Sequence, residues 1–487
     1  MTTSPRSTAP DPAAAPPSPR RLLTLFLLAW APRLALALVF LRLPIALDDM
    51  YQYDMLALSL ARGDGYRWYQ RDYVQGLRAY FERAYNIELE PGTIPVDGFA
   101  TVFRAPGYPA FLAVVYRIAG EAQRIAAARL VQSALGAALA PLTALLAYRL
   151  RLPPRAGTAA AVVVGLYPIL WMYPLGLGSE NLFLLLSTAG VLLLLRAGAD
   201  GRAPSAFLAG LILGAAAMTR GALAPFLVFG AAWLARRAGG RAVAAFAVAA
   251  AALIVPWSVR NSLVLGRPAF IENSFGYNLF VGAHPEGDGG FDAAIAYLPT
   301  RYLDDGERDR WSLEQALAFL RADPWEAVAR LPRRLAYLAG FETRELIFIY
   351  SNGFFGPIAS PILVGLYLLL VLPWIVVAAG APFAMAAAQD RGARDLVLWF
   401  VAATLLVYLP ILAEPRFHLP LVPLLAPYAA AAWLRPRLFA PAPSAAYRLA
   451  LTSLVLLVGL WTWDFVRQAS RTIAVLSPGG HALRLEY

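Results

Sequence analysis

The sequence predicts an all-α polytopic membrane protein, a bundle of about eleven transmembrane helices with two helical loops on its outer face. The first observation is composition. Of the 487 residues, 59% are hydrophobic and 15% are charged, whereas soluble globular proteins have about 45–50% and about 25%. Second, the apolar residues are gathered in runs of about 15–25 residues, close to the length that a helix needs to cross a bilayer. Third, the arginines lie mostly between these runs.

The first 20 residues, 1–20, are rich in Pro, Ala and Ser and are expected to form a disordered cytoplasmic tail. The apolar run 22–43 is too long for a signal-peptide core of about 7–15 residues, so we assign 21–43 to the first transmembrane helix. Ten further runs lie near 125–149, 157–176, 180–197, 204–219, 221–235, 242–258, 357–380, 395–413, 417–434 and 446–465. The exact helix count within 204–235 stays open, because the runs 204–219 and 221–235 are both near the lower length limit for a transmembrane helix.

Arginines between the runs predict the orientation, because loops rich in Arg face the cytoplasm. That side carries Arg149, Arg151, Arg155, Arg196, Arg202, Arg236, Arg237, Arg241, Arg391, Arg394, Arg435, Arg437 and Arg448. The N-terminus is then cytoplasmic, and the transmembrane blocks 125–258 and 357–465 alternate with the outer loops 44–124 and 259–356 and an outer tail, 466–487. The outer face carries the acids Asp48, Asp49, Glu180 and Glu414.

Both outer loops carry helical signals. In the first loop, a helix is expected after Asp48, with Gly63 suited to its C-terminal cap. Residues 108–119 are apolar but too short to span, which predicts a helix lying in the interface. The second loop has two apparent capping boxes, at Ser312 with Gln315 and at Asp323 with Glu326. No internal repeat is evident, which disfavours transporter folds built from duplicated halves.

The composition also excludes several kinds of site. The chain has no cysteine, so it offers no disulfide, Cys-ligated metal or thiol nucleophile. It has no lysine either, which excludes a Walker-type phosphate lysine and Schiff-base chemistry. The net charge of +11 follows the pattern of the cytoplasmic loops, so no nucleic-acid partner is predicted.

Asp48 and Asp49 stand where the first apolar run ends, and each has two interpretations. Either one could cap the helix that begins here, although one cap needs only one residue. Alternatively, one carboxylate takes a proton from an acceptor hydroxyl, at a lipid–water boundary where partial desolvation raises its basicity. Two adjacent acids could also bind a divalent cation, but two ligands alone specify none.

Three outer-face arginines are candidate anion ligands. Arg104 precedes the turn sequence 105–107, where it either reaches lipid headgroups or clamps a phosphate through two parallel hydrogen bonds. Arg220 lies between two apolar runs, on the side away from the cytoplasmic arginines, which favours a functional role. Arg260 follows Pro256-Trp257, a pattern equally typical of interface anchoring.

The remaining outer polar residues are less specific. Glu180 could cap the helix over 180–197 or join a site. Glu414 and Arg416 could pair with each other. A lone histidine such as His418 is more often structural than catalytic. Arg33 lies inside the first span, where an unpaired charge is costly. We expect it to pair with another helix or with a carbonyl.

Taken in order, these segments resemble the polytopic glycosyltransferases of the GT-C superfamily, close to the family 39-like enzymes that include protein O-mannosyltransferases and the lipid A aminoarabinose transferase. The resemblance extends over about 22–435. Two departures are Ala105, where a second Pro is common in the family, and the lack of a large soluble C-terminal domain that some relatives have. The matching segments are 49–53, 56–57, 60–61, 63–66, 104–112, 179–180, 219–220, 256–261, 276–279 and 416–421.

The resemblance implies a GT-C-like bundle that transfers a hexosyl or pentosyl group from a polyprenyl phosphate on the outer face of a bacterial inner membrane. Asp49 matches the catalytic base best, with Asp48 as the adjacent alternative. The acceptor could be a lipid, a glycan or a protein. No cofactor or metal is required by the sequence. Residues expected to bind the donor phosphate are Arg104, Arg220, Arg260 and Arg416, and those expected near the sugar or acceptor are Tyr53, Glu180, Glu414 and His418.

Two other classes of function remain compatible with the sequence. A transporter or flippase of a lipid-linked saccharide would use the same phosphate-binding arginines but would need no base. A non-catalytic subunit of an envelope-polymer system would not need the outer-loop acids at all.

If the protein is the enzyme, a single displacement would invert the anomeric carbon, with Asp49 as the base and arginines that bind the departing phosphate.

Overall fold

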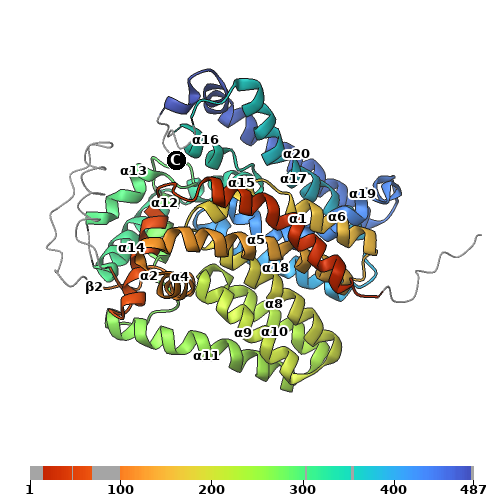
Figure 1. Ribbon diagram of the computed structural model, residues 1–487, viewed down its shortest axis with the longest axis horizontal. Coiled ribbons are helices and arrows are strands. Elements are labelled where there is room, and N and C mark those ends of the chain that lie inside the picture. Colours follow the sequence, from red (N-terminus) through yellow and green to blue (C-terminus); the bar gives the residue numbers. More distant parts are fainter. Residues whose placement is uncertain (1–14, 46–47, 69–98, 302–303, 352–355, 484–487) are drawn as a thin grey trace, which may run out of the picture.

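A computed structural model describes residues 15–45, 48–68, 99–301, 304–351 and 356–483 (Figure 1). The described part is almost entirely helical. Its strands, β1 (Arg67–Trp68) and β2 (Phe99–Ala100), pair antiparallel with Arg67 opposite Ala100. The predicted class is confirmed: the chain is an all-α polytopic membrane protein. Most of the predicted tail and residues 69–98 of the first outer loop lie outside the described residues.

In the described part of the chain, seven helices are long and apolar enough to cross a membrane. An eighth span results if the bent pair α6 (Pro154–Gly165) and α7 (Ile169–Met172) with η2 (Tyr173–Leu175) counts as one, broken by 54°. The seven are α1 (Pro19–Val39), η1 (Glu121–Gln123) continued by α5 (Arg124–Arg149), α8 (Glu180–Asp200), α11 (Gly240–Leu265), α17 (Ser360–Ala386), α18 (Arg391–Ile411) and α20 (Ala445–Leu476).

The count is lower than the eleven expected because several apolar runs form shorter helices. α9 (Ala203–Thr219) and α10 (Ala224–Ala238) are separated by the extended residue Arg220 and by η3 (Gly221–Leu223). In the run 417–434, only α19 (Val422–Trp433) is α-helical. The preceding turns form η5 (Pro415–Leu421), where two prolines remove backbone donors.

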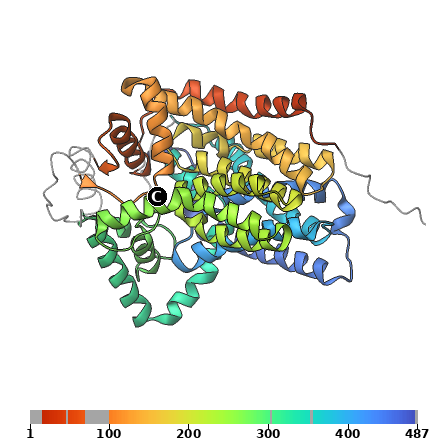
Figure 2. The ribbon, with the colours of Figure 1, turned by 90° about the horizontal axis from the view of Figure 1, so that it is seen from below.

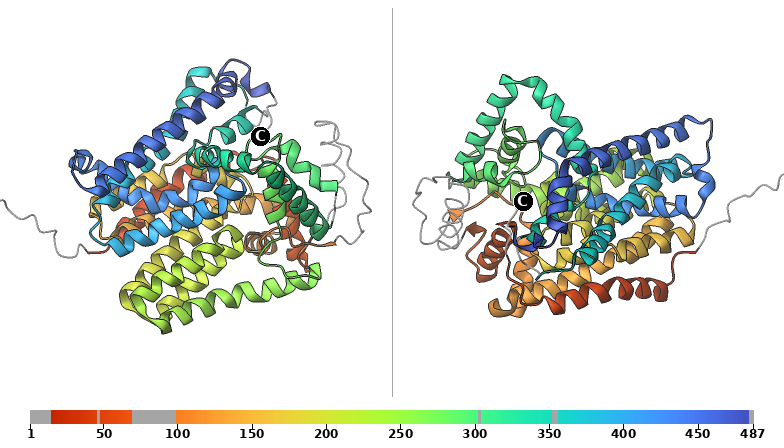
Figure 3. Two further views of the ribbon diagram at one scale, coloured as in Figure 1. Left: turned by 180° about the vertical axis from the view of Figure 1, so that it is seen from behind. Right: turned by 90° about the horizontal axis from the view of Figure 1, so that it is seen from above.

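Close helix packing holds the bundle together. α9 lies against α8 and α11, α1 lies against α5, and α17 lies against α19 and α20. Small residues allow the closest approach: a Cβ on Gly210 of α9 would lie 2.2 Å from the carbonyl oxygen of Phe246 on α11. Figure 3 shows α20, in dark blue, running beside α17 towards the outer helices. α19 is followed by η6 (Pro436–Phe439), and α20 is followed by η7 (Gly480–Ala482).

The helices of the two outer loops gather at one end of the bundle. In Figures 1 and 2 this end is on the left, whereas α1 begins at the opposite end. The first loop contributes α2 (Asp48–Arg62) and α4 (Gly107–Ala119), which pack together. The second contributes α12 (Phe275–Ala283), α13 (Ala293–Tyr297), η4 (Leu298–Arg301), α14 (Asp305–Ala322), α15 (Pro324–Ala339) and α16 (Thr343–Ser351).

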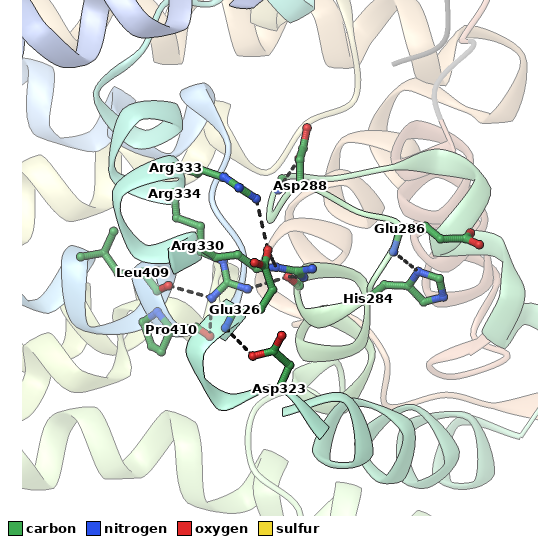
Figure 4. Close-up of polar contacts among 12 residues, drawn as sticks. His284, Glu286, Asp288, Asp323, Glu326, Arg330, Arg333, Arg334, Leu409 and Pro410 are labelled. Atoms are coloured by element: carbon green, nitrogen blue, oxygen red, sulfur yellow. Dashed lines mark hydrogen bonds and ion pairs between the residues drawn. The ribbon is translucent and has the colours of Figure 1, made fainter. Parts of the chain in front are cut away.

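One of the two predicted capping boxes is wrong. Ser312 lies inside α14, where its hydroxyl donates to the carbonyl of Arg308 at 2.7 Å. The helix starts earlier because Asp304 accepts a hydrogen bond from the backbone N–H of Glu307 at 2.9 Å. Only half of the second box is formed: Asp323 accepts from the N–H of Glu326 at 2.9 Å (Figure 4), which confirms it as the N-cap. The N–H of Asp323 donates to the Phe319 carbonyl at 3.1 Å, and the Glu326 side chain accepts from Arg330 at 3.1 Å.

Candidate active site

Five charged side chains meet at the end of the bundle where the helices of the two predicted outer loops gather. We call Asp49, Arg104, Glu180, Arg220 and Arg416 the outer charge cluster. Arg104 contacts Asp49 directly, and Arg220 contacts Glu180 directly. Arg416 joins the two pairs, since its Nη1 lies 3.6 Å from Asp49 Oδ2 and 3.9 Å from Glu180 Oε1. Within these five residues, three guanidinium groups thus face two carboxylates.

Local backbone structure places each of these groups at the cluster. Asp49 is in the first turn of α2 and Glu180 is the first residue of α8. Arg104 precedes α4, Arg220 follows α9, and Arg416 is in η5. All five residues were identified in the sequence as charges on the predicted outer face, next to apolar runs. The fold brings them together from five separate segments.

The two turns that carry Arg104 and Arg220 pack against each other. A Cβ on Gly107 would lie 2.8 Å from the Met218 carbonyl oxygen and 2.8 Å from Thr219 Oγ1. Only glycine therefore lets the start of α4 approach the end of α9 this closely.

Glu272, which sequence reasoning missed, ties the same two turns together. Its Oε2 accepts from the N–H of Ala105 and its Oε1 from the N–H of Gly221, both at 3.2 Å. Each of these residues directly follows a cluster arginine. Burial raises the pKa of the Glu272 carboxyl above its usual value, although Arg104, Arg220 and the two backbone donors oppose the shift. Its only sequence signal is an acid in the loop after α11.

The electrostatics of Asp49 differ from expectation. Burial acts to raise its pKa, as desolvation does, but the positive charges of Arg104, Arg416 and Arg220 outweigh it and hold the pKa below its usual value. Asp49 is therefore ionised at neutral pH, and without another anion beside these arginines it is a weaker base than an ordinary aspartate.

Glu180 binds an arginine rather than capping its helix. Ser179, the residue before it, has no capping hydrogen bond, and its hydroxyl accepts from Arg220 Nε at 2.9 Å. The Arg220 guanidinium also lies 5.8 Å from the ring centre of Phe183 and 6.0 Å from that of Phe417. Two aromatic rings, a hydroxyl and a carboxylate thus fix this guanidinium in one orientation.

Tyr53 lies beside the cluster. Its ring centre is 5.6 Å from the Arg104 guanidinium carbon and 4.9 Å from the ring of Tyr108, in an edge-to-face arrangement. Gln52 supports the same arginine, because its Oε1 accepts from Arg104 Nε at 2.7 Å. Asp48 begins α2, but its side chain lies outside the described residues.

Arg260 is not brought to the cluster. It lies on α11 and donates to the carbonyls of Thr101 at 2.5 Å and Tyr66 at 3.0 Å, with its guanidinium 4.9 Å from the Trp257 ring. Tyr66 in turn donates its hydroxyl to the Arg104 carbonyl at 2.9 Å. Arg260 thus supports the chain that leads to Arg104 instead of facing the same space.

Glu414 and His418 are both fully buried. The predicted pair of Glu414 with Arg416 is not found: Glu414 Oε1 accepts instead from Arg344 Nη1 at 2.9 Å and from the Phe291 N–H at 2.7 Å. His418 is fully buried and stacks on Trp374 with ring centres 3.8 Å apart. In the described part of the chain, no group of three or more His, Asp or Glu side chains is arranged to hold a metal ion.

No family model and no curated protein sequence matches the chain. Among solved structures, it is similar to the apo oligosaccharyltransferase of Archaeoglobus fulgidus and to AglB of the same organism in complex with an inhibitory peptide and a dolichol-phosphate. Both matches have 14% sequence identity and a TM-score of 0.45, and they cover 96% of this chain. The chain spans 61% of the length of these proteins. We therefore argue function from the residues of the cluster.

Proposed function

We propose that the protein is a membrane glycosyltransferase of the GT-C type that moves a sugar from a polyprenyl-phosphate donor to an acceptor hydroxyl on the outer face. The observation that carries this proposal is the outer charge cluster, in which an ionised Asp49 contacts Arg104 and faces Arg416. Such a transfer needs cations for a departing phosphate and a carboxylate for an incoming hydroxyl, and both are present in one place.

In this mechanism the donor phosphate binds among Arg104, Arg220 and Arg416. Guanidinium groups suit phosphate because they offer parallel N–H donors. As the bond between the anomeric carbon and the phosphate oxygen breaks, these cations stabilise the negative charge left on the phosphate. The acceptor oxygen forms the new bond from the opposite side and its proton goes to Asp49, so the anomeric carbon is inverted.

The depressed pKa of Asp49 has a role in this scheme. The arginines that lower it are the same ones that would bind the phosphate. A bound phosphate offsets their positive charge at Asp49, and the pKa of the carboxyl rises towards its usual value. Asp49 then becomes a stronger base when the donor is in place, which couples proton removal from the acceptor to donor binding.

The site faces the periplasm if the arginine-rich loops are cytoplasmic.

The test is transfer from a panel of radiolabelled polyprenyl-phosphate sugars by the purified protein, with membrane extract as the source of acceptor. Asp49→Asn should reduce transfer by about 10²–10⁴-fold, the usual contribution of a general base. Asp64→Asn is the matched control, since Asp64 is an exposed acid just after α2, and it should transfer like the wild type. If no donor gives a product although the donor binds tightly, lipid-linked saccharide transport becomes the better explanation.

A further inference from the structure

Apart from the charge cluster, a polar cavity lies among the outer-loop helices and the C-terminal half of α20. Its volume is about 250 Å³. The loop before α13, the helices α15 and α16, and α20 each contribute side chains to its wall. Pockets for drug-sized ligands measure about 300–1,000 Å³. A cavity just below that range suits a ligand of about one sugar ring.

The polar wall of this cavity is already ordered in the structure. Asp288 contacts Arg467 directly and accepts from the Tyr337 hydroxyl at 2.7 Å. Its other oxygen accepts from the Gly290 N–H at 2.9 Å. Gln468 donates to Asp464 at 2.7 Å, which leaves its carbonyl oxygen as an acceptor. The wall therefore offers fixed donors and acceptors side by side.

This mixture of groups suits hydroxyls better than a simple ion. Arginines and aspartates both line the cavity, and each lining carboxylate already accepts at least one hydrogen bond. A carboxylate has about four lone-pair positions and a guanidinium has five N–H groups, so Asp288 and Arg467 keep capacity for further hydrogen bonds. A sugar hydroxyl donates and accepts at once. Phe291, Ala293 and Ile347 add an apolar wall for the C–H groups of a ring.

The cavity is joined to the outer charge cluster through one buried glutamate. Arg344 lines the cavity and donates to Glu414 Oε1 at 2.9 Å, and the N–H of Phe291, another lining residue, donates to the same oxygen at 2.7 Å. Two residues after Glu414 comes Arg416, which faces Asp49. A ligand in the cavity would thus contact residues that are hydrogen-bonded to the segment that presents Arg416.

We infer that this cavity binds a sugar ring of the acceptor, so that the acceptor is a glycan or a glycolipid and not an amino-acid side chain. The catalytic part of this inference rests on the proposed function. The binding of a sugar ring by the cavity does not, and it can be measured without any transfer reaction.

Saturation-transfer NMR on the full-length protein in nanodiscs that contain no glycoside detergent tests the binding directly. The probes are methyl hexosides and a methyl hexuronoside. We expect at least one of them to receive saturation from the protein, with affinity reduced about tenfold or more in Asp288→Asn. Ala293→Phe should abolish the contact by filling the cavity, and Asp64→Asn should leave it unchanged. Thermal unfolding of each variant verifies that it is folded.

The outcomes separate the two proposals. Absence of saturation transfer for every probe at tens of millimolar, or saturation that Asp288→Asn and Ala293→Phe leave unchanged, overturns the inference. Sugar binding in a protein that transfers no donor sugar leaves the cavity as a saccharide site and removes the proposed function. If the label is recovered on protein and no probe sugar binds, the proposed function stands and the inference about the cavity is overturned. Extraction of the product into organic solvent identifies a glycolipid, and retention in water identifies a free glycan.

Discussion

Two sets of arginines in this molecule have opposite kinds of partner. Arg33, Arg129 and Arg334 are almost fully buried and donate to backbone carbonyls. The cluster arginines Arg104, Arg220 and Arg416 lie near carboxylates, and their side chains keep 23%, 16% and 20% of their surface exposed.

The carbonyl-bound set joins helices. Arg33 of α1 donates to the Gly165 carbonyl at 2.6 Å, where α6 ends, and to the Ala29 carbonyl at 2.7 Å. Arg334 of α15 donates to the carbonyls of Leu409 and Pro410 at 2.9 and 2.8 Å (Figure 4). A ligand cannot take the place of a buried backbone carbonyl without disturbing the helix to which that carbonyl belongs. A carboxylate beside a partly exposed arginine can share it with an incoming anion, so we expect partner type to separate structural arginines from ligand-binding ones.

Replacing a cluster arginine should affect catalysis far more than folding. We expect Arg104→Gln to lower kcat/KM for transfer about 10²–10³-fold, because a cation that stabilises the departing phosphate is lost. The fold should persist, since the guanidinium is partly exposed. Steady-state transfer kinetics and thermal unfolding of the same preparation measure both effects. A large fall in the unfolding temperature with unchanged kcat/KM of the folded fraction would contradict the distinction.

Replacing a carbonyl-bound arginine should do the reverse. Arg33→Gln leaves the Gly165 carbonyl without its buried donor, which costs about 1–3 kcal/mol of stability. Activity per folded molecule should stay within about twofold. Denaturation in detergent, followed by transfer assays on the folded fraction, tests this. Loss of kcat/KM without loss of stability would place Arg33 in the functional set.

The pH dependence should distinguish the two sets again. Because the cluster arginines hold the pKa of Asp49 below its usual value of about 3.9, Asp49 stays ionised as the pH falls to about 5. Arg104→Gln removes one of these charges, so the acid limb of kcat/KM should move to higher pH. Arg33→Gln should not move it. Coincident acid limbs for Arg104→Gln and the wild type would show that this limb does not report Asp49.

The smallest effect is expected from Glu272, a positioning residue. Glu272→Ala removes the acceptor shared by the N–H groups of Ala105 and Gly221. The turns carrying Arg104 and Arg220 then lose their common support, and we expect the KM for donor to rise about tenfold with a smaller change in kcat. Glu272→Gln, which keeps an oxygen acceptor, should recover part of the loss. Equal KM values for the wild type and Glu272→Ala would exclude a positioning role.

Much of the fold followed from the sequence because run length and arginine placement are direct consequences of the bilayer. Arg33 was expected to bind a carbonyl or another helix, and it does. Fewer long helices than apolar runs result because α9 and α10 are short, as the runs 204–219 and 221–235 already indicated. The prolines of η5 also shorten the helix within the run 417–434, which apolar run length alone does not register.

The site was harder to predict. Asp49, Arg104 and Arg220 stand out in the sequence because charges are scarce beside apolar runs. Glu272 lies in the loop after α11 and Arg344 in the first turn of α16, both inside the long second loop, where a charge has no such contrast. Only the fold shows that Glu272 joins two turns and that Arg344 binds Glu414. Proximity in sequence also misled: Glu414 pairs with Arg344, 70 residues away, and not with Arg416.

The bond between Arg33 and the Gly165 carbonyl has a consequence for biogenesis. The first helix enters the membrane with a charge at its interior, for which insertion scales give a cost of about 2.5–3.5 kcal/mol for an arginine at a helix centre. Its partner on α6 lies 132 residues later in the chain, so at about 5–20 residues per second it is synthesised about 7–26 seconds after Arg33. We expect α1 alone to insert poorly, and Arg33→Leu to correct this in a reporter assay of the isolated segment. The nascent chain would then complete its first span only when α6 docks against it.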